Sequence, residues 1–206
     1  MKKICLCIII FYSVNLRAHP VIYKGGWVYQ GTFMPMMSKM RFGHSLSSRY
    51  ALVANSSWFK DFDNYRDYTV GMNFLLKRWL QKDSQGNIYG GAHLGRYHGD
   101  SKSGNLGNLF LMADWESRSH YVVAQSKTYH FSGETKFDYT FRYGFAPFVA
   151  GMNTLQTWLI LQAYYFEQQS KEVIVTPMIR FFYRNVLWET GYSTKGHSFL
   201  TLMVHF

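Results

Sequence analysis

The chain contains only two cysteines, Cys5 and Cys7, and both lie near its start. A short basic start precedes an apolar run, Ile4 to Tyr12, and the segment ends at the small residue Ala18. This order is typical of a secretory signal peptide, so we predict a signal peptide over residues 1–18. The remaining chain, 19–206, then has no cysteine, which excludes a disulfide framework and a thiolate metal site.

Long apolar runs are also absent beyond this segment. No stretch approaches the roughly 20 apolar residues that a transmembrane helix needs, so no such helix is predicted. Hydrophobic residues nevertheless make up 48% of the chain, while the mean hydropathy is only −0.18. Apolar and polar residues are therefore interleaved, as alternating β-strands require.

Acidic residues are scarce relative to basic ones. Removing Lys2, Lys3 and Arg17 with the signal peptide leaves 19 of the 22 basic residues against 12 acidic ones, a net charge of +7. This balance suits an anion-preferring lumen or contact with acidic lipopolysaccharide. Because the chain is predicted to be secreted, is rich in aromatics and has no Lys/Arg cluster, nucleic acid is not an expected partner.

The last ten residues form an amphipathic strand that ends on an aromatic residue. One face carries the apolar residues Leu200, Leu202, Val204 and Phe206. This pattern resembles the sorting signal of bacterial outer-membrane β-barrels. The resemblance implies a location in the outer membrane, with its lipid and lipopolysaccharide, and recognition by the barrel-assembly machinery.

Other segments alternate in the same way. In Glu134 to Ala146, aromatic residues occupy every second position, and polar or small residues occupy the positions between them. In lipid the backbone must satisfy its own hydrogen bonds, so such strands must close into a barrel. The aromatic content of 19% suits the girdles at both bilayer interfaces. We predict an all-β fold, a single antiparallel transmembrane β-barrel over 19–206, with 12 strands, or 10 if the first region is less regular.

Charged residues on the alternate face predict a polar interior. A two-residue turn at Arg184-Asn185 would place Arg180 directly opposite Glu189. A charge on the lipid face costs a few kcal/mol at mid-bilayer, so both should point inward. The predicted interior charges are Arg180, Glu189, Arg142, Asp138, Asp114 and Lys77. They would line a solute path or brace a salt-bridged plug.

Two stretches carry a family resemblance, residues 73–79 with 83–89 and residues 175–189, together with the start His19-Pro20 and the end Val204–Phe206. They resemble a proteobacterial family of small outer-membrane proteins that are often encoded beside heavy-metal (copper-type) efflux systems. The resemblance implies a barrel fold and a role in metal stress, with metal-efflux components as partners. No catalytic or ligand residue carries over from it.

A methionine cluster offers soft ligands of the kind that copper(I) selects. It comprises Met34, Met36, Met37 and Met40. The alternative is that these side chains are adaptable apolar contacts at the rim or in lipid. His19 would carry a free α-amine after cleavage and could then chelate copper, or it could be a frayed terminus. Copper is the only cofactor that the sequence suggests.

One loop raises an enzymatic alternative. His98, Asp100 and Ser101 bring a histidine, an acid and a serine together, as in outer-membrane enzymes that modify lipid A. The loop is also Gly/Ser-rich and reads more simply as a turn, so we predict no catalytic residues. The leading hypothesis is a non-enzymatic narrow passive channel or an accessory in envelope metal handling. The alternatives are a lipid A-modifying enzyme and a structural or adhesive barrel.

Overall fold

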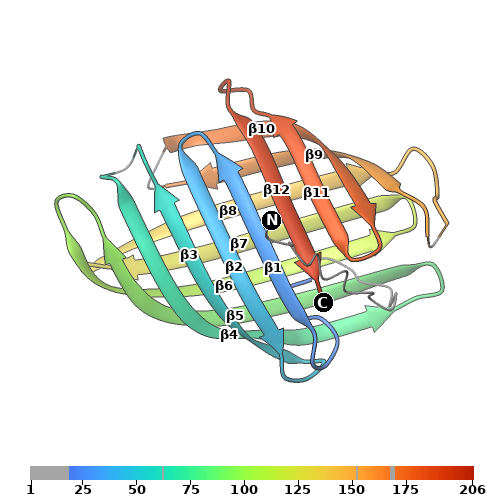
Figure 1. Ribbon diagram of the computed structural model, residues 1–206, viewed down its shortest axis with the longest axis horizontal. Helices are drawn as coiled ribbons and strands as arrows, with labels where there is room; N and C mark the ends of the chain where they lie inside the picture. The colour runs from blue at the N-terminus through green and yellow to red at the C-terminus, as the bar shows by residue number, and fades with distance from the viewer. Residues whose placement is uncertain (1–18, 62, 152, 168–169) are drawn as a thin grey trace, which may run out of the picture.

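Twelve antiparallel strands close into one barrel (Figure 1). The computed structural model describes residues 19–61, 63–151, 153–167 and 170–206, so the predicted signal peptide lies outside the described residues. Each strand pairs with its neighbours in the chain, and β1 pairs with β12. The predicted barrel and its larger strand count are confirmed. In the part of the chain that is described, no helix is long and apolar enough to cross a membrane.

The strands vary in length from 7 to 16 residues. They are β1 (Trp27–Met34), β2 (Met37–Ser45), β3 (Tyr50–Phe59), β4 (Tyr65–Leu80), β5 (Ser84–His98), β6 (Ser103–Ser117), β7 (His120–Phe131), β8 (Glu134–Phe145), β9 (Gln156–Phe166), β10 (Ser170–Tyr183), β11 (Val186–Tyr192) and β12 (Ser198–His205). The longest three are consecutive, β4 to β6, and form one wall of the barrel.

The first and last strands close the sheet. Val28 lies opposite His205 and Phe33 opposite Leu200, and the Thr32 and Thr201 hydroxyls hydrogen-bond across the seam at 2.9 Å. The backbones of Trp27 and Phe206 also bond to each other in both directions. This pairing leaves no open edge, which matters in lipid because no water is there to satisfy one.

Alternation along each strand separates an apolar exterior from a polar interior. On β8 the aromatic residues 137, 139, 141, 143 and 145 are all exposed, whereas Asp138 between them is buried. On β12 the apolar face proposed as the sorting signal is outward, with Leu200 and Leu202 exposed and Thr201 buried. The predicted assignment of faces is confirmed on both strands.

Local turn chemistry sets the strand register. The β7–β8 turn is Ser132-Gly133, and both residues have positive φ, the backbone shape that matches the twist of a two-residue hairpin. The β10–β11 turn is Arg184-Asn185, as predicted, and it pairs Arg180 with Glu189.

The β4 strand departs from simple alternation at Leu76. Leu75 lies opposite Tyr89 but Lys77 lies opposite Ile88, so Leu76 is an extra residue that forms a bulge. Beyond the bulge the faces are exchanged. The inward position expected for Lys77 is therefore wrong: the shifted register turns Lys77 outward, and Arg78 lies on the inner face at the rim, where it donates to Asn87.

The barrel has two rims that differ in what closes them. The rim where β1 begins and β12 ends is called here the terminal rim. The chain from His19 to Gly26 precedes β1 at that rim, and its first four residues, 19–22, are buried. The rim that holds the β1–β2, β5–β6 and β7–β8 turns is called the opposite rim.

Candidate functional site

A charged chamber of about 270 Å³ occupies the middle of the barrel. Its wall comes from strands all round the sheet, except β4 and β5. The charged side chains that line it are Lys39, Arg41, Lys127, Asp138, Arg142, Arg180 and Glu189. Polar residues between them include Gln30, Thr32, Asn55, Gln125, Gln162 and Thr201.

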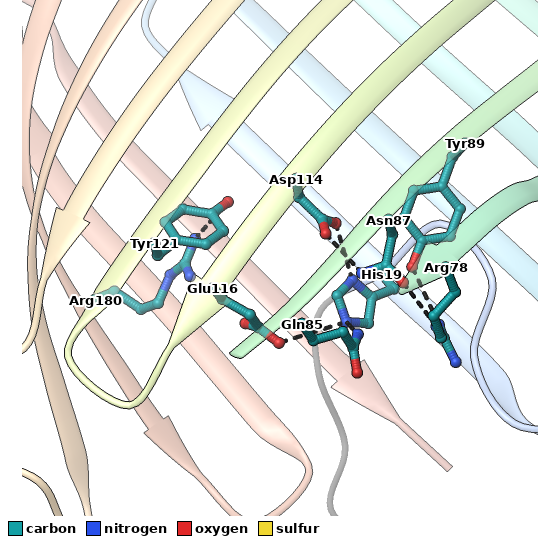
Figure 2. A network of polar contacts seen from close by, with 9 residues as sticks. All are labelled: His19, Arg78, Gln85, Asn87, Tyr89, Asp114, Glu116, Tyr121 and Arg180. Atoms are coloured by element: carbon teal, nitrogen blue, oxygen red, sulfur yellow. Dashed lines mark hydrogen bonds and ion pairs between the residues drawn. The ribbon is translucent and has the colours of Figure 1, made fainter. Parts of the chain in front are cut away.

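Glu189 is the centre of one cluster in this wall. Its Oε1 accepts a hydrogen bond from Arg180 Nε at 2.7 Å, and Arg142 Nη1 lies 3.2 Å from both carboxylate oxygens. Arg142 Nε also donates to Gln162 at 2.7 Å. The Arg180 guanidinium lies 4.6 Å from the ring centroid of Tyr121 (Figure 2). One buried carboxylate therefore serves two arginines from different strands.

Asp138 is the centre of a second cluster. Its Oδ2 accepts hydrogen bonds from the hydroxyls of Tyr129 at 3.0 Å and Tyr164 at 3.5 Å. Lys39 Nζ lies 3.9 Å from the same oxygen and donates to the Tyr164 hydroxyl. Lys127 lies directly across the sheet from Asp138, and its ammonium is 4.5 Å from the Tyr129 ring centroid. This cluster likewise has more cations than acids.

An aromatic cluster lies between the chamber and the opposite rim. Its buried members are Met36, Met37, Phe59, Tyr65, Tyr97, Leu106, Tyr129, Phe131 and Phe166. The rings contact one another closely: Phe59 and Phe166 are stacked with centroids 5.0 Å apart, and Tyr65 and Tyr97 are stacked at 5.5 Å. These side chains therefore narrow that end of the barrel.

The first residues of the described chain enter the barrel at the terminal rim. His19 Nδ1 lies 3.2 Å from Asp114 Oδ2, and its Nε2 lies 3.8 Å from Glu116 and 3.4 Å from Gln85 (Figure 2). The imidazole also stacks on Tyr89, with ring centroids 5.8 Å apart. His19 is thus held between two carboxylates and against the inner wall.

Hydrogen bonds continue from this segment into the wall. Asn73 Nδ2 donates to the carbonyl of Pro20 at 3.2 Å. Asn73 Oδ1 is also 3.0 Å from His93 Nε2, and His93 Nδ1 is 2.6 Å from Asn108 Oδ1. Gly91, across from Asn73, has no room for a side chain, because a Cβ there would lie 2.2 Å from the Phe110 ring. The inner wall is therefore shaped closely around this network.

Apolar contacts add to the anchoring. Val21 packs with Ala51, Val53 and Tyr89. Ile22 packs with a second group that includes Leu187 and Met203, and its backbone N–H donates to Ser45. Residues 19–22, called here the amino-terminal plug, therefore occlude the terminal rim from inside.

The structure brings some of the predicted interior residues together and separates others. Arg180, Glu189 and Arg142 form one cluster, and Asp138 lies in the chamber wall. Asp114 lies instead at the terminal rim, where its Oδ1 accepts a hydrogen bond from Asn87 at 2.6 Å. Arg78, absent from the predicted set, donates to Asn87 at 2.7 Å in place of Lys77.

The structure brings only part of the predicted copper site together. Met34, Met36 and Met37 lie in one cluster, with Met34 packed against the other two and their aromatic neighbours. Met36 and Met37 are buried among aromatic rings near the opposite rim, and Met40 on the outer face is 45% exposed. Met34 lies across from Met37 in the first hairpin, whereas His19 is at the terminal rim. Within the described residues, no group of three or more His, Cys, Asp or Glu side chains could hold a metal ion.

The residues of the enzymatic alternative are also placed apart. Ser101 Oγ donates to Asp63 Oδ2 at 2.6 Å, and the backbone N–H of Ser101 bonds to the same carboxylate. His98 is exposed on the face of β5 opposite to the inward Tyr97. The serine hydroxyl therefore donates to Asp63 and not to His98, the base that the enzymatic alternative assigns to it.

Sequence reasoning missed two of the chamber's cations, Lys39 and Arg41. Lys39 and Arg41 alternate with the exposed Met40 and Phe42, so a period of two was present in β2. The signal was weak because the strand is short and contains His and Gly at its end.

A closed antiparallel barrel with an even number of strands, an apolar outside and a charged inside is the architecture of bacterial outer-membrane proteins. The protein is an outer-membrane β-barrel. It is similar to the solved KdgM porin, with a TM-score of 0.55 and 12% identity over 88% of this chain and 98% of that chain. The KdgM porin in complex with disordered oligogalacturonate gives a TM-score of 0.54 with the same identity and coverage.

A third solved structure, Pseudomonas aeruginosa OccK2 (OpdF) in complex with glucuronate, gives a TM-score of 0.43 and 12% identity over 94% of this chain and 68% of that chain. No protein-family model matches the chain, and no curated protein matches it in sequence. At 12% identity the likeness to the KdgM porin establishes a shared fold.

Proposed function

We propose that the protein is a narrow passive channel that lets small polar solutes cross the outer membrane. The observation that carries this proposal is the polar chamber of about 270 Å³ in the middle of a barrel whose outside is apolar. A barrel that served only as a scaffold would gain nothing from this space, since buried charges are costly unless they are paired or hydrated. The similar KdgM structures are named as porins, which agrees with transport.

Both ends of the chamber are restricted, so the resting conductance is expected to be small. The aromatic cluster narrows the opposite rim, and the amino-terminal plug occupies the terminal rim. The plug is held by one imidazole, a few hydrogen bonds and two small apolar contacts. Displacing the plug should therefore require less free energy than opening any other part of the path.

Conductance of the purified, folded protein in planar lipid bilayers tests the proposal. Discrete, small current steps are expected from the wild type. The variant Asp114→Asn, which removes the main carboxylate partner of His19, should give larger or longer openings. Protein-free bilayers with the same detergent are the control. If both forms stay silent after verified insertion, the channel proposal is wrong.

The metal-handling role remains a prediction. The methionines and His19 lie at different ends of the barrel, so they supply no shared site within the described residues. Growth on copper of a strain that lacks the protein tests the role without any assumption about the site. Reduced tolerance, restored by the wild-type chain, would support it, and unchanged tolerance would remove it.

A further inference from the structure

The wall of the chamber carries more positive than negative charge. Five cationic side chains line it, but only two carboxylates, Asp138 and Glu189, do so. A third acid, Asp67, is buried across the sheet from Ser57, which lines the chamber. With all three acids ionised, two positive charges are still in excess.

Both carboxylates that line the chamber already have cations as neighbours. Glu189 binds Arg142 and Arg180, and Asp138 has Lys39 at 3.9 Å together with two tyrosine hydroxyls. Asp138 keeps one oxygen, Oδ1, without a hydrogen-bond partner, but this single carboxylate cannot balance both Lys39 and Lys127, which lies across the sheet from it. The remaining two, Arg41 and Lys127, therefore decide what the chamber can hold.

Arg41 and Lys127 form no ion pair with any carboxylate in the described part of the chain, and both line the same chamber. Arg41 Nε is buried and has no hydrogen-bond partner in the structure. Its neighbours across the sheet are Gln30 on β1 and Asn55 on β3, both neutral. Lys127 has the face of the Tyr129 ring beside it. Each unpaired buried charge costs free energy that a bound counter-charge would recover.

We propose that this chamber is a binding site for a small oxyanion, a carboxylate or a phosphate, with Arg41 and Lys127 as its main contacts. The proposal rests on the channel function above and names its class of solute. A guanidinium offers a planar fork of donors that matches carboxylate and phosphate oxygens, and an ammonium adds a point charge. The neutral amides of Gln30, Asn55 and Gln125 supply further donors around them.

The size of the chamber limits the solute. Sites for drug-sized ligands span roughly 300–1,000 Å³, so a chamber of about 270 Å³ holds a small organic acid or inorganic phosphate at any one time. Glu189 and Asp138 affect which cations the solute can reach. Because each carboxylate is bound by its own cations or hydroxyls, Arg41 and Lys127 stay available to the solute.

Ion selectivity and block in planar bilayers test the site. The wild type should favour anions in a potassium chloride gradient, and millimolar succinate or inorganic phosphate should reduce the chloride current. Arg41→Gln and Lys127→Gln should each weaken the block about tenfold, which corresponds to a loss of about 1.4 kcal/mol of binding free energy. Lys102→Gln removes the same charge from the exposed β5–β6 turn and should change neither property.

The two solutes distinguish the source of the oxyanion. Block by succinate alone points to carboxylates, block by phosphate alone points to phosphates, and either supports the site. A conducting channel that is cation-selective or unselective, or a block that survives in both variants, overturns the site but leaves the channel function standing. If Arg41→Gln fails to fold, as judged by the heat-dependent mobility of the barrel on gels, Arg41→Lys serves instead. It should keep the anion preference and bind succinate less tightly.

A binding measurement separates this site from the channel function. The unfolding temperature of the folded barrel in detergent should rise with phosphate or succinate relative to chloride at equal ionic strength, and Lys127→Gln should abolish the rise. A silent bilayer with this rise contradicts the channel but supports the site. A silent bilayer without it overturns both.

Discussion

At the scale of single residues, the interior is governed by how few carboxylates it contains. Glu189 is 1% exposed and is the counter-charge for two arginines that come from β8 and β10. Removing one partner of a buried ion pair leaves uncompensated charge, which costs more than the pair itself contributed. The two arginines thus depend on a single side chain.

Glu189→Gln is therefore expected to lower the free energy of unfolding by about 3 kcal/mol. Arg142 and Arg180 would face each other without a counter-charge. Urea unfolding in lipid vesicles, followed by tryptophan fluorescence, measures the change. The matched control is Glu172→Gln, because Glu172 is an exposed carboxylate paired with Lys195 and such pairs contribute little. Equal stability of Glu189→Gln and the wild type would contradict this view of the cluster.

At the scale of elements, the amino-terminal plug differs from every strand. Its backbone is not part of the sheet ladder, and it is held by side chains of Asp114, Asn73 and Ser45. An element held by few contacts opens with a small part of the global stability. The plug can therefore move while the barrel remains closed.

Val21→Asp should displace the plug and raise the mean bilayer conductance several-fold. The new carboxylate would lie among Val53, Ala51 and Tyr89, in a site with no partner for it. Lys24→Asp is the control, because Lys24 is exposed in the same segment and should leave conductance unchanged. Unchanged conductance in Val21→Asp would show that residues 19–22 do not restrict the path.

Another feature at this scale is the bulge at Leu76. By exchanging the faces of β4, it turns Lys77 outward near the terminal rim and places Arg78 beside Asn87 and Tyr89. Such a change cannot be read from a period of two, because the extra residue is recognisable only once both neighbouring strands are paired.

At the scale of the whole molecule, lipid is the solvent of the outer face. Leu109 and Leu111 on β6 and Val70 on β4 are each more than half exposed. Such residues would be a liability on a water-facing surface but are required by a hydrocarbon one.

Leu111→Arg is expected to destabilise the barrel by about 2–4 kcal/mol, since Leu111 lies in the middle of β6 on the outer face. Leu200→Arg, on the outer face near the start of β12, should cost no more than about 1 kcal/mol, because the penalty falls toward the interface. Unfolding titrations in vesicles compare the two. If both substitutions lowered the free energy of unfolding equally, the bilayer would not be centred on the middle of β6.

Much of the fold follows from local rules that act within a strand or a hairpin. Side chains of a strand point alternately to its two faces, so the aromatic row on β8 and the apolar row on β12 could be assigned without coordinates. The turn at Arg184-Asn185 is equally local, and it brings Arg180 and Glu189 together across one hairpin. The role of the β12 row as a sorting signal stays a prediction.

Contacts across the lumen depend instead on how the whole sheet closes. Arg142 reaches Glu189 from β8, three strands away, and His19 reaches Asp114 from 95 positions earlier in the chain. Closure also turns Lys39, Arg41 and Lys127 toward one shared space. Strand periodicity specifies only which way a side chain faces, whereas the tilt and stagger of twelve paired strands decide which inward side chains meet.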